Sequence, residues 1–240
     1  MKHNFLLNPK PNVTKVIAGN EEHQIFVVDD FLINPGHLLD CANEGAEFQS
    51  ISTDYYPGVR KQIDGNYAQL LTKAAADICL EMLGLSADVS VKTEVNLCAF
   101  SMATTAATQL RPIQSLPHFD TSNPAQFAVI HYLCSQEHGG TSFYRHRKTG
   151  FEGITENRVH TYLEALKQEV VAARFIGQRY MNGDNEWFER YANVEAKFNR
   201  AIVYQGNLLH SGDIKCPGGL GRSPKDGRLT ANTFITIKTN

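Results

Sequence analysis

The sequence lacks the hallmarks of several protein classes. Its five cysteines are widely spaced and include no C-x-x-C pair, which argues against a disulfide framework and against a cysteine-type zinc site. It contains no long uncharged apolar run, and its first residues lack an apolar core of signal-peptide length. We therefore expect a reduced, soluble, cytoplasmic protein with no membrane segment.

The chain also has little net charge. Its 23 Lys and Arg against 25 Asp and Glu give a formal net charge of −2 at pH 7, so there is no bulk attraction to nucleic acid or to an anionic membrane. The hydrophobic content of 42% and charged content of 20% are those of an ordinary globular protein. A chain of 240 residues can bury roughly 70–75% of its unfolded surface without staples, and we expect one domain over residues 1–240.

Regular alternation of strands and helices is missing as well. Periodicity predicts helices at 66–83 and 155–177, one opening at Asn34-Pro35, a shorter one near 184–192, and strands at 23–32, 88–100, 126–134, 139–147, 200–212 and 228–238. Residues 50–65 and 101–112 are expected to be loops. This order argues against a doubly wound parallel sheet. It favours a mainly β (α+β) sandwich or barrel, flanked by N-terminal helices and carrying a helical insertion at about 151–195.

The stretch "SLPHFDTSNP" (115–124) places His118 and Asp120 two residues apart, just before an apolar run. In an extended chain, positions i and i+2 project to the same face, so an imidazole and a carboxylate point the same way. A structural alternative is that Asp120 opens an Asx-turn and His118 is merely half-exposed. Farther along, His210 follows an apolar strand and precedes a Ser-Gly turn.

A strand begins near Arg228, and Thr230 and Asn232 share its face by the period of two. An arginine at an inward-facing β position is costly unless an anion meets it. No acidic residue follows Arg228 in the sequence, so its anion would come from elsewhere in the fold or from a ligand. Two histidines and one carboxylate form the facial triad of non-haem Fe(II) oxygenases, which leaves coordination positions open for co-substrate and O₂.

Five segments together resemble a known family. They are "HFD" (118–120), "IHYLC" (130–134), "HGGTSFYRH" (138–146), "LLHSGD" (208–213) and "RLTANTF" (228–234), and the opening "IFVVDDFLINPGHLLDCA" (25–42) adds to them. Their order and content are similar to those of the 2-oxoglutarate- and Fe(II)-dependent oxygenases, specifically the prolyl-hydroxylase-like branch. The resemblance spans roughly residues 23–238 and implies a double-stranded β-helix, a jelly roll of two antiparallel sheets.

The resemblance also implies roles for individual residues. His118, Asp120 and His210 would be the iron ligands, and Arg228 would hold the far carboxylate of 2-oxoglutarate through its planar two-donor fork. Tyr132 and Thr230 would contact the same carboxylate, with Asn232 a weaker candidate. Because the spacing from His210 to Arg228 is long, Arg222 stays an alternative to Arg228 as the arginine that holds this carboxylate.

The activity implied by this resemblance is hydroxylation of an unactivated C–H bond in an amino acid, a peptidyl side chain or a small metabolite, with release of succinate and CO₂. Its cofactors would be Fe(II), 2-oxoglutarate and O₂, with ascorbate as an optional reductant. The partner would be a small-molecule or peptide substrate and not nucleic acid or membrane, and a homodimer stays open. Two alternatives stay open too: a Zn or Ni jelly-roll hydrolase or isomerase, and a non-catalytic binding module.

Some other residues have simpler explanations. His131 faces away from Tyr132 and is expected to be a packed or surface histidine, and Trp187 is expected to pack the insertion. Cys98 and Cys134 are most simply small core residues. The basic cluster "FYRHRK" (143–148) fits either a solvated strand end or a substrate entrance, and "YYPGVR" (55–60), with Arg60, is a loop candidate for substrate contact.

Overall fold

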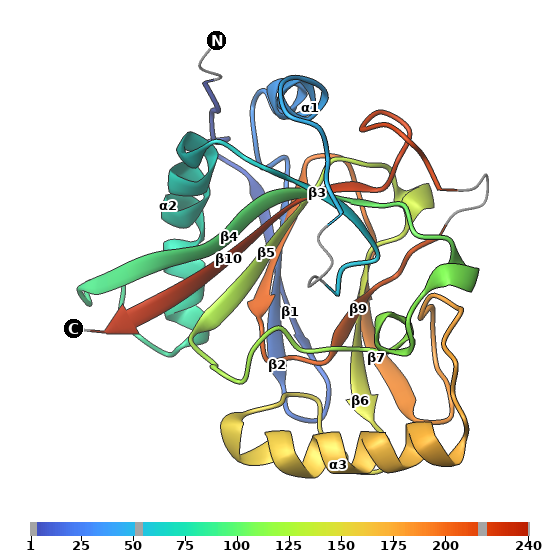
Figure 1. Cartoon of the computed structure of the whole chain (residues 1–240). Helices are drawn as coiled ribbons and strands as arrows, with labels where there is room; N and C mark the ends of the chain where they lie inside the picture. Colours follow the sequence, from blue (N-terminus) through green and yellow to red (C-terminus); the bar gives the residue numbers. More distant parts are fainter. Residues whose placement is uncertain (1–3, 51–54, 216–219, 240) are drawn as a thin grey trace.

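Two antiparallel β-sheets packed face to face form the centre of the protein in this computed structural model, which describes residues 4–50, 55–215 and 220–239 (Figure 1). The larger sheet has the order β1 (Asn12–Ala18), β2 (His23–Asp29), β8 (Arg200–Gln205), β5 (Gln126–Tyr132), β10 (Leu229–Thr239), β4 (Val91–Ala103) and β3 (Gly58–Gln62). The smaller sheet has the order β7 (Phe188–Val194), β6 (Thr141–His146) and β9 (His210–Gly212). Sequence-distant strands are therefore neighbours, and the expectation of a mainly antiparallel β fold with a few helices is confirmed.

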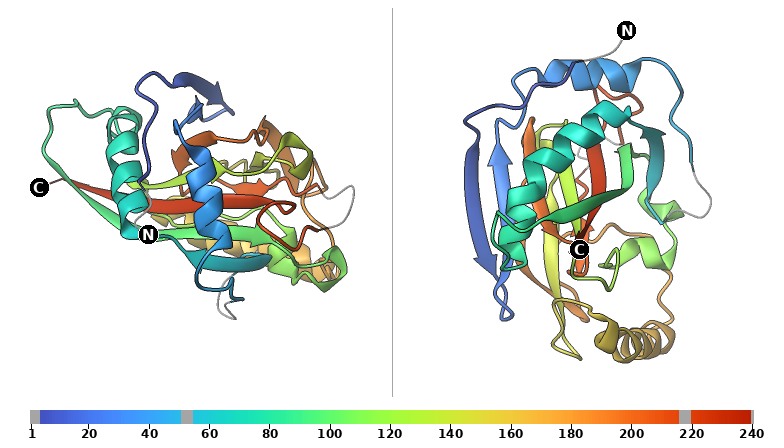
Figure 2. Two further views of the ribbon diagram at one scale, coloured as in Figure 1. Left: turned by 90° about the horizontal axis from the view of Figure 1, so that it is seen from above. Right: turned by 90° about the vertical axis from the view of Figure 1, so that its left-hand side faces the viewer.

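Among the described residues, three α-helices pack around the sheets: α1 (Pro35–Asn43), α2 (Gly65–Met82) and α3 (Glu156–Ala172). Figure 2 shows α2 lying across one face of the larger sheet, with α1 and α3 at opposite ends of the molecule. Leu71, Ala75 and Cys79 recur on the buried face of α2, as its periodicity predicts. The Asp64 side chain accepts a hydrogen bond from the backbone N–H of Asn66 at its start.

The alternation of side chains along each strand separates two layers of core. Phe127 and Val129 of β5 face the helices, while Ala128, Ile130 and Tyr132 face the smaller sheet, where they pack with residues such as Phe143. The space between the two sheets is therefore lined by alternate residues of both. Polar residues on this inner face are consequently exceptional and mark a candidate site.

Several predicted boundaries were wrong. The expected loop at 50–65 contains β3, the expected loop at 101–112 begins with the last residues of β4, and the helix expected near 184–192 is β7. Only α3 of the predicted helical insertion is helical, because β7 completes the smaller sheet by pairing with β6. Strand β1 was missed, and β10 begins one residue after Arg228.

The predicted packed residues lie as expected. His131 is fully buried, bonded through Nδ1 to the Tyr67 hydroxyl and through Nε2 to Asn199 Oδ1. Trp187 packs on Phe175. The described cysteines are free thiols, and Cys216 lies outside the described residues. Among the helices that are described, none has the length and apolar character needed to cross a bilayer.

Candidate metal centre

Backbone pairing brings His118 and His210 together. The N–H of His118 donates to the carbonyl of His210 at 2.9 Å, and the N–H of His210 donates back at 2.8 Å. The Asp120 N–H donates to the Gly206 carbonyl at 2.7 Å. The H-x-D segment thus runs as a short extra strand beside residues 206–210, which closes a separation of ninety residues in the sequence.

The three predicted ligand side chains converge on one point. His118 Nε2 lies 3.7 Å from Asp120 Oδ1, and His210 Nε2 lies 3.6 Å from Asp120 Oδ2. One donor atom from each residue lies within 4.8 Å of the other two. The His210 side chain is 6% exposed and that of Asp120 is 13% exposed, whereas that of His118 is 50% exposed. The cluster is therefore closed on the His210 side and open to solvent beside His118.

The tautomer of His210 is set by its neighbour. Its Nδ1 lies 2.8 Å from the carbonyl oxygen of Leu208, and because a carbonyl oxygen only accepts, Nδ1 must donate the hydrogen. Burial lowers the pKa of His210 to about 4 and so favours the neutral ring, in which Nε2 presents a lone pair toward Asp120. A hydrogen bond from the far ring nitrogen to a backbone carbonyl is the usual way in which a metal-binding histidine is oriented.

Two hydrogen-bond acceptors, on Asp120 and His210, face each other at the centre of this cluster. Asp120 Oδ2 is buried without a hydrogen-bond partner, and the nearby His210 Nε2 has no proton to offer it. Burial raises the pKa of the Asp120 carboxyl, with the charges of His118 and Arg60 opposing the rise, and burial lowers the pKa of His210 to about 4. A cation between these atoms would satisfy both lone pairs, so the residues fit a divalent metal ion.

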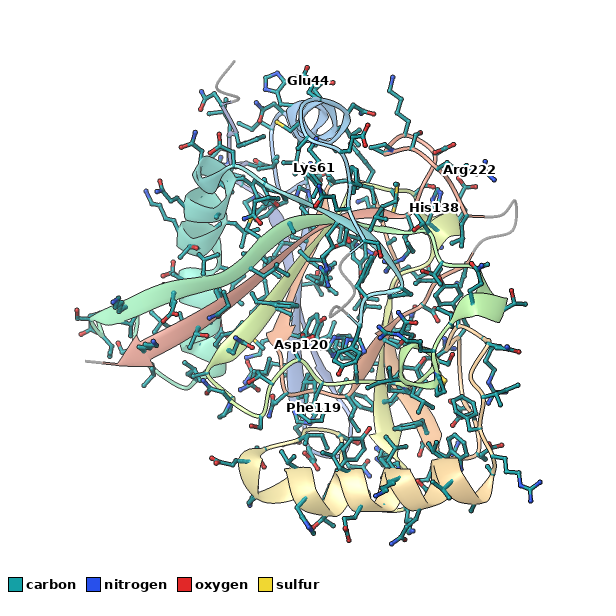
Figure 3. The ribbon with its side chains drawn as sticks, viewed as in Figure 1. Glu44, Lys61, Phe119, Asp120, His138 and Arg222 are labelled. Carbon is teal, nitrogen blue, oxygen red and sulfur yellow. The ribbon has the colours of Figure 1, made fainter. Side chains whose placement is uncertain are left out.

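Phe119, the residue between the two H-x-D ligands, packs this segment against α3. The Phe119 ring meets the Tyr162 ring edge to face, with centroids 6.0 Å apart, and Figure 3 shows Phe119 directed toward that helix, below Asp120. Tyr162 in turn packs on His146, whose Nε2 lies 2.8 Å from Glu169 Oε2 on the same helix. Because side chains alternate along an extended segment, Phe119 packs against the core around α3 while His118 and Asp120 face the metal-ligand cluster.

Arg228 is buried between the sheets, with only 5% of its surface exposed. Its Nη2 donates to the Gly140 carbonyl at 2.7 Å, while its Nε is buried without a hydrogen-bond partner. No carboxylate of the described residues lies within ion-pair distance of it. Arg222, the alternative in the sequence, is exposed, and Figure 3 shows it at the periphery beside His138, away from Asp120.

The Gly139-Gly140 pair allows the close packing that positions Arg228. A Cβ at Gly140 would lie 1.9 Å from the Val194 carbonyl oxygen, and a Cβ at Gly139, whose φ is +79°, would lie 1.5 Å from that of Asp213. Side chains at either position would collide with backbone. The turn can therefore approach both β7 and the end of β9 while its carbonyl meets Arg228.

The other predicted cofactor contacts also lie on the inner face. Tyr132 is fully buried, and its hydroxyl lies 2.7 Å from Thr141 Oγ1 of the smaller sheet. Thr230 pairs with Tyr132 across the strands, and its hydroxyl donates to the Ser101 carbonyl at 3.4 Å. The Oδ1 of Asn232 is buried without a hydrogen-bond partner.

Two inner-face residues were missed from the sequence. Tyr204 packs its ring on His210 with centroids 4.9 Å apart, and Thr141 bonds Tyr132 across the sheets. In "RAIVYQ", strand alternation directs Tyr204 to the face opposite that of Val203, and this pattern could have identified Tyr204 as an inner-face residue. No local pattern marks Thr141. The basic cluster 143–148 is mostly satisfied internally, since Arg145 pairs with Glu152 and Glu189.

Sequence comparison assigns the chain to a family. A family described as "Family of unknown function (DUF6445)" matches residues 9–235. The chain belongs to the DUF6445 family. No curated protein shows significant similarity to this family member.

The chain was also compared with solved structures. The "non-heme alpha ketoglutarate dependent epimerase SnoN from nogalamycin biosynthesis" aligns over 90% of this chain and 79% of its own, with a TM-score of 0.52 at 11% identity. EvdO2 from Micromonospora carbonacea var. aurantiaca covers 91% and 88% at 10% identity and a TM-score of 0.46. HygX from Streptomyces hygroscopicus, solved with nickel, 2-oxoglutarate and hygromycin B, covers 90% and 83% at 12% identity and a TM-score of 0.45. The likeness to SnoN shows that this DUF6445 protein has the same overall fold.

Proposed function

We propose that this protein is a 2-oxoglutarate- and Fe(II)-dependent oxygenase of the prolyl-hydroxylase-like branch, built on a double-stranded β-helix. It would hydroxylate an unactivated C–H bond of a small molecule or peptidyl side chain, with release of succinate and CO₂. The observation that carries the proposal is the convergence of His118, Asp120 and His210. The fold shared with SnoN supports it.

The donor set selects the class of metal. Two imidazoles and one carboxylate without a thiolate suit Fe(II), and three protein ligands on one face leave further positions for co-substrate and O₂. The Leu208 carbonyl holds His210 in the required tautomer, and Phe119 holds the H-x-D segment against α3. When bound, iron and 2-oxoglutarate would together supply the redox chemistry with O₂.

Arg228 supports 2-oxoglutarate as the co-substrate. A buried guanidinium that meets no carboxylate within ion-pair distance among the described residues is costly, and a ligand carboxylate would offset that cost through a bidentate hydrogen-bonded pair. Tyr132 and Thr230, paired across β5 and β10, would flank the same carboxylate. The co-substrate would thus span from the metal to Arg228, with its two ends held by different groups.

The test is the anaerobic addition of Fe(II) and then 2-oxoglutarate. We expect a visible charge-transfer band that requires both additions. A Zn or Ni hydrolase or isomerase that does not use 2-oxoglutarate, or a binding module that does not chelate it, would give none. Asp120→Ala should abolish the band and metal binding, whereas Asp184→Ala, which removes an exposed carboxylate paired with Arg147, should leave both intact. A band that survives in Asp120→Ala would refute the site.

A second measurement distinguishes reaction outcomes on the same centre. Succinate release is screened across metabolites and peptides, and products are analysed by mass. We expect a product that has gained one oxygen atom. Because SnoN is named an epimerase, a product of unchanged mass would replace hydroxylation by epimerisation while leaving the cofactor proposal intact.

A further inference from the structure

An uncharged amide on β10 carries a buried acceptor that nothing in the ligand-free protein satisfies. Asn232 is only 8% exposed, and its Oδ1 is buried without a hydrogen-bond partner. Burial of such an oxygen without a hydrogen bond is costly, and folded proteins retain few of them. An acceptor of this kind inside a candidate site points to a ligand that supplies the missing donor.

Asn232 faces the space between the sheets. The next residue, Thr233, lies with its hydroxyl 3.4 Å from Cys98 Sγ, in the core layer on the helix side of the larger sheet. Because side chains alternate along a strand, Asn232 points to the opposite face. β10 lies between β5 and β4 within the larger sheet (Figure 1), so this face looks toward the smaller sheet.

The residues around Asn232 on that face offer it no donor. Its cross-strand partners are Ala99 on β4 and Ile130 on β5, both buried and apolar. Its same-face neighbours along β10 are Phe234 and Thr230, and the Thr230 hydroxyl already donates to a backbone carbonyl. The unmet acceptor is therefore set among apolar groups and one hydroxyl whose proton is in use.

The position of Asn232 ties it to the candidate site. On β5, the partner of Asn232 lies between Tyr132, a proposed co-substrate contact, and Ala128. Ala128 pairs with Tyr204 of β8, whose ring packs on the metal-ligand candidate His210 with centroids 4.9 Å apart. Asn232 therefore lies at a level between the candidate metal centre and the proposed co-substrate contacts at the start of β10.

The chemistry of Oδ1 restricts what can meet it. The carboxylates and the keto group of 2-oxoglutarate only accept hydrogen bonds, as does Oδ1 itself, so the co-substrate cannot satisfy this oxygen. An ammonium group could donate, but a neutral amide flanked by Ala99 and Ile130 would leave its buried charge without a counter-ion. The matching group is an uncharged N–H or O–H donor.

We infer that Asn232 accepts a hydrogen bond from an uncharged N–H or O–H group of the primary substrate. The inference rests on the proposed function and adds a substrate class, namely molecules that carry an amide N–H or a hydroxyl. A site built to bond such a group rejects analogues that lack it, because buried polar groups are then left unpaired. Asn232 would thus determine specificity, while the three metal ligands and Arg228 serve the cofactors.

The experiment uses the full chain with Fe(II) and 2-oxoglutarate under anaerobic conditions, so that binding is measured without turnover. One set of probes is the N-acetyl amino-acid amides, each beside counterparts methylated at each N–H. The other set is methyl glycosides, each beside counterparts methylated at each hydroxyl. Thermal shift identifies binders, and calorimetric titration gives Kd. We expect a binder whose methylation at one position weakens it by about 5- to 150-fold, the loss expected when a buried polar group is left unpaired, and the set that contains it distinguishes an amide from a hydroxyl.

Variants assign the effect to Asn232. Asn232→Leu keeps a similar volume and removes the acceptor, so it should weaken the binder by a similar factor, remove most of the difference between the binder and its methylated counterpart, and leave 2-oxoglutarate affinity unchanged. Its thermal midpoint without ligands should be equal to or above that of the parent, because no hydrogen bond is lost. The matched control is Asn96→Leu, since Asn96 Oδ1 accepts from Gln126 Nε2 at 3.0 Å and Thr236 Oγ1 at 2.7 Å. The control should lower the midpoint and bind the probe as the parent does.

The outcomes separate this inference from the proposed function. Equal binding of every probe and its methylated counterparts, unchanged probe binding in Asn232→Leu, or no binder in either set would each overturn the inference, while 2-oxoglutarate binding by the parent would keep the proposed function. Weaker 2-oxoglutarate binding in Asn232→Leu would also overturn it, by making Asn232 a co-substrate contact. A midpoint lowered as in the control would make the amide a structural group, with the same consequence. Failure of the parent to bind 2-oxoglutarate would instead refute the proposed function.

Discussion

Replacement of Arg228 by methionine should change stability and co-substrate binding in opposite directions. In the ligand-free protein the guanidinium is buried, donates to Gly140, and meets no carboxylate of the described residues within ion-pair distance. Methionine has a similar length and no charge to desolvate. Replacement of a buried ion pair by apolar residues of similar volume is commonly neutral or stabilising by about 1–4 kcal/mol. The same reasoning applies to Arg228, because no carboxylate of the described residues would be left unpaired when it is replaced.

These magnitudes translate into measurable shifts. In a chain of this size each kcal/mol moves the thermal midpoint by roughly 2–4 °C, so Arg228→Met should raise the midpoint of the ligand-free protein by several degrees. The same change removes a charge-assisted pair to 2-oxoglutarate, worth about 1.5–3 kcal/mol. Co-substrate affinity should therefore fall by roughly 10- to 150-fold.

The assay is thermal unfolding without ligands, together with calorimetric titration of 2-oxoglutarate into the metal-loaded protein. The control is Arg200→Met, because Arg200 bonds both oxygens of Asp29, at 2.6 and 3.0 Å. That variant should lower the midpoint and leave 2-oxoglutarate affinity unchanged. If Arg228→Met destabilised the ligand-free protein as much as the control does, Arg228 would be a structural residue and the reasoning from its lack of a carboxylate partner would fail.

Two further predictions concern stability. Burial lowers the pKa of His131 to about 4 from about 6.5 in the unfolded chain, so the unfolded state binds the extra proton first as the pH falls. About 3 kcal/mol of unfolding free energy that is present above pH 6.5 should therefore be lost as the pH falls to 4. Denaturant unfolding of the metal-free protein at several pH values should show that the unfolding free energy depends less steeply on pH in His131→Gln than in the parent. Gly140→Ala should lower the free energy of unfolding by about 1–3 kcal/mol, because its Cβ would lie 1.9 Å from the Val194 carbonyl oxygen. The control is Gly36→Ala, where no atom lies within 4 Å of the added Cβ; denaturant unfolding should show it to be neutral or slightly stabilising.

Local pattern was sufficient for most of the secondary structure. The apolar spacing of α2, its end near Gly84 with φ +66°, and the two-residue period of β5 all follow from short-range rules. Prediction failed where a segment has no strong pattern of its own. Strand β3, "GVRKQ", has little β propensity and exists because β4 and Gln49 flank it, and β7 was taken for a helix because its pairing with β6 is not visible locally.

The candidate site, too, was predictable from the sequence only in part. The residue types and the i, i+2 spacing of His118 and Asp120, the Gly-Gly turn and the inward parity of Thr230 can all be read along the chain, because strand geometry alternates side chains wherever the strand lies. The meeting of that pair with His210, and the burial of Arg228 while Arg222 stays exposed, depend on which strands become neighbours. That pairing is decided by the burial of two whole sheets against each other, a cooperative outcome that no short segment encodes.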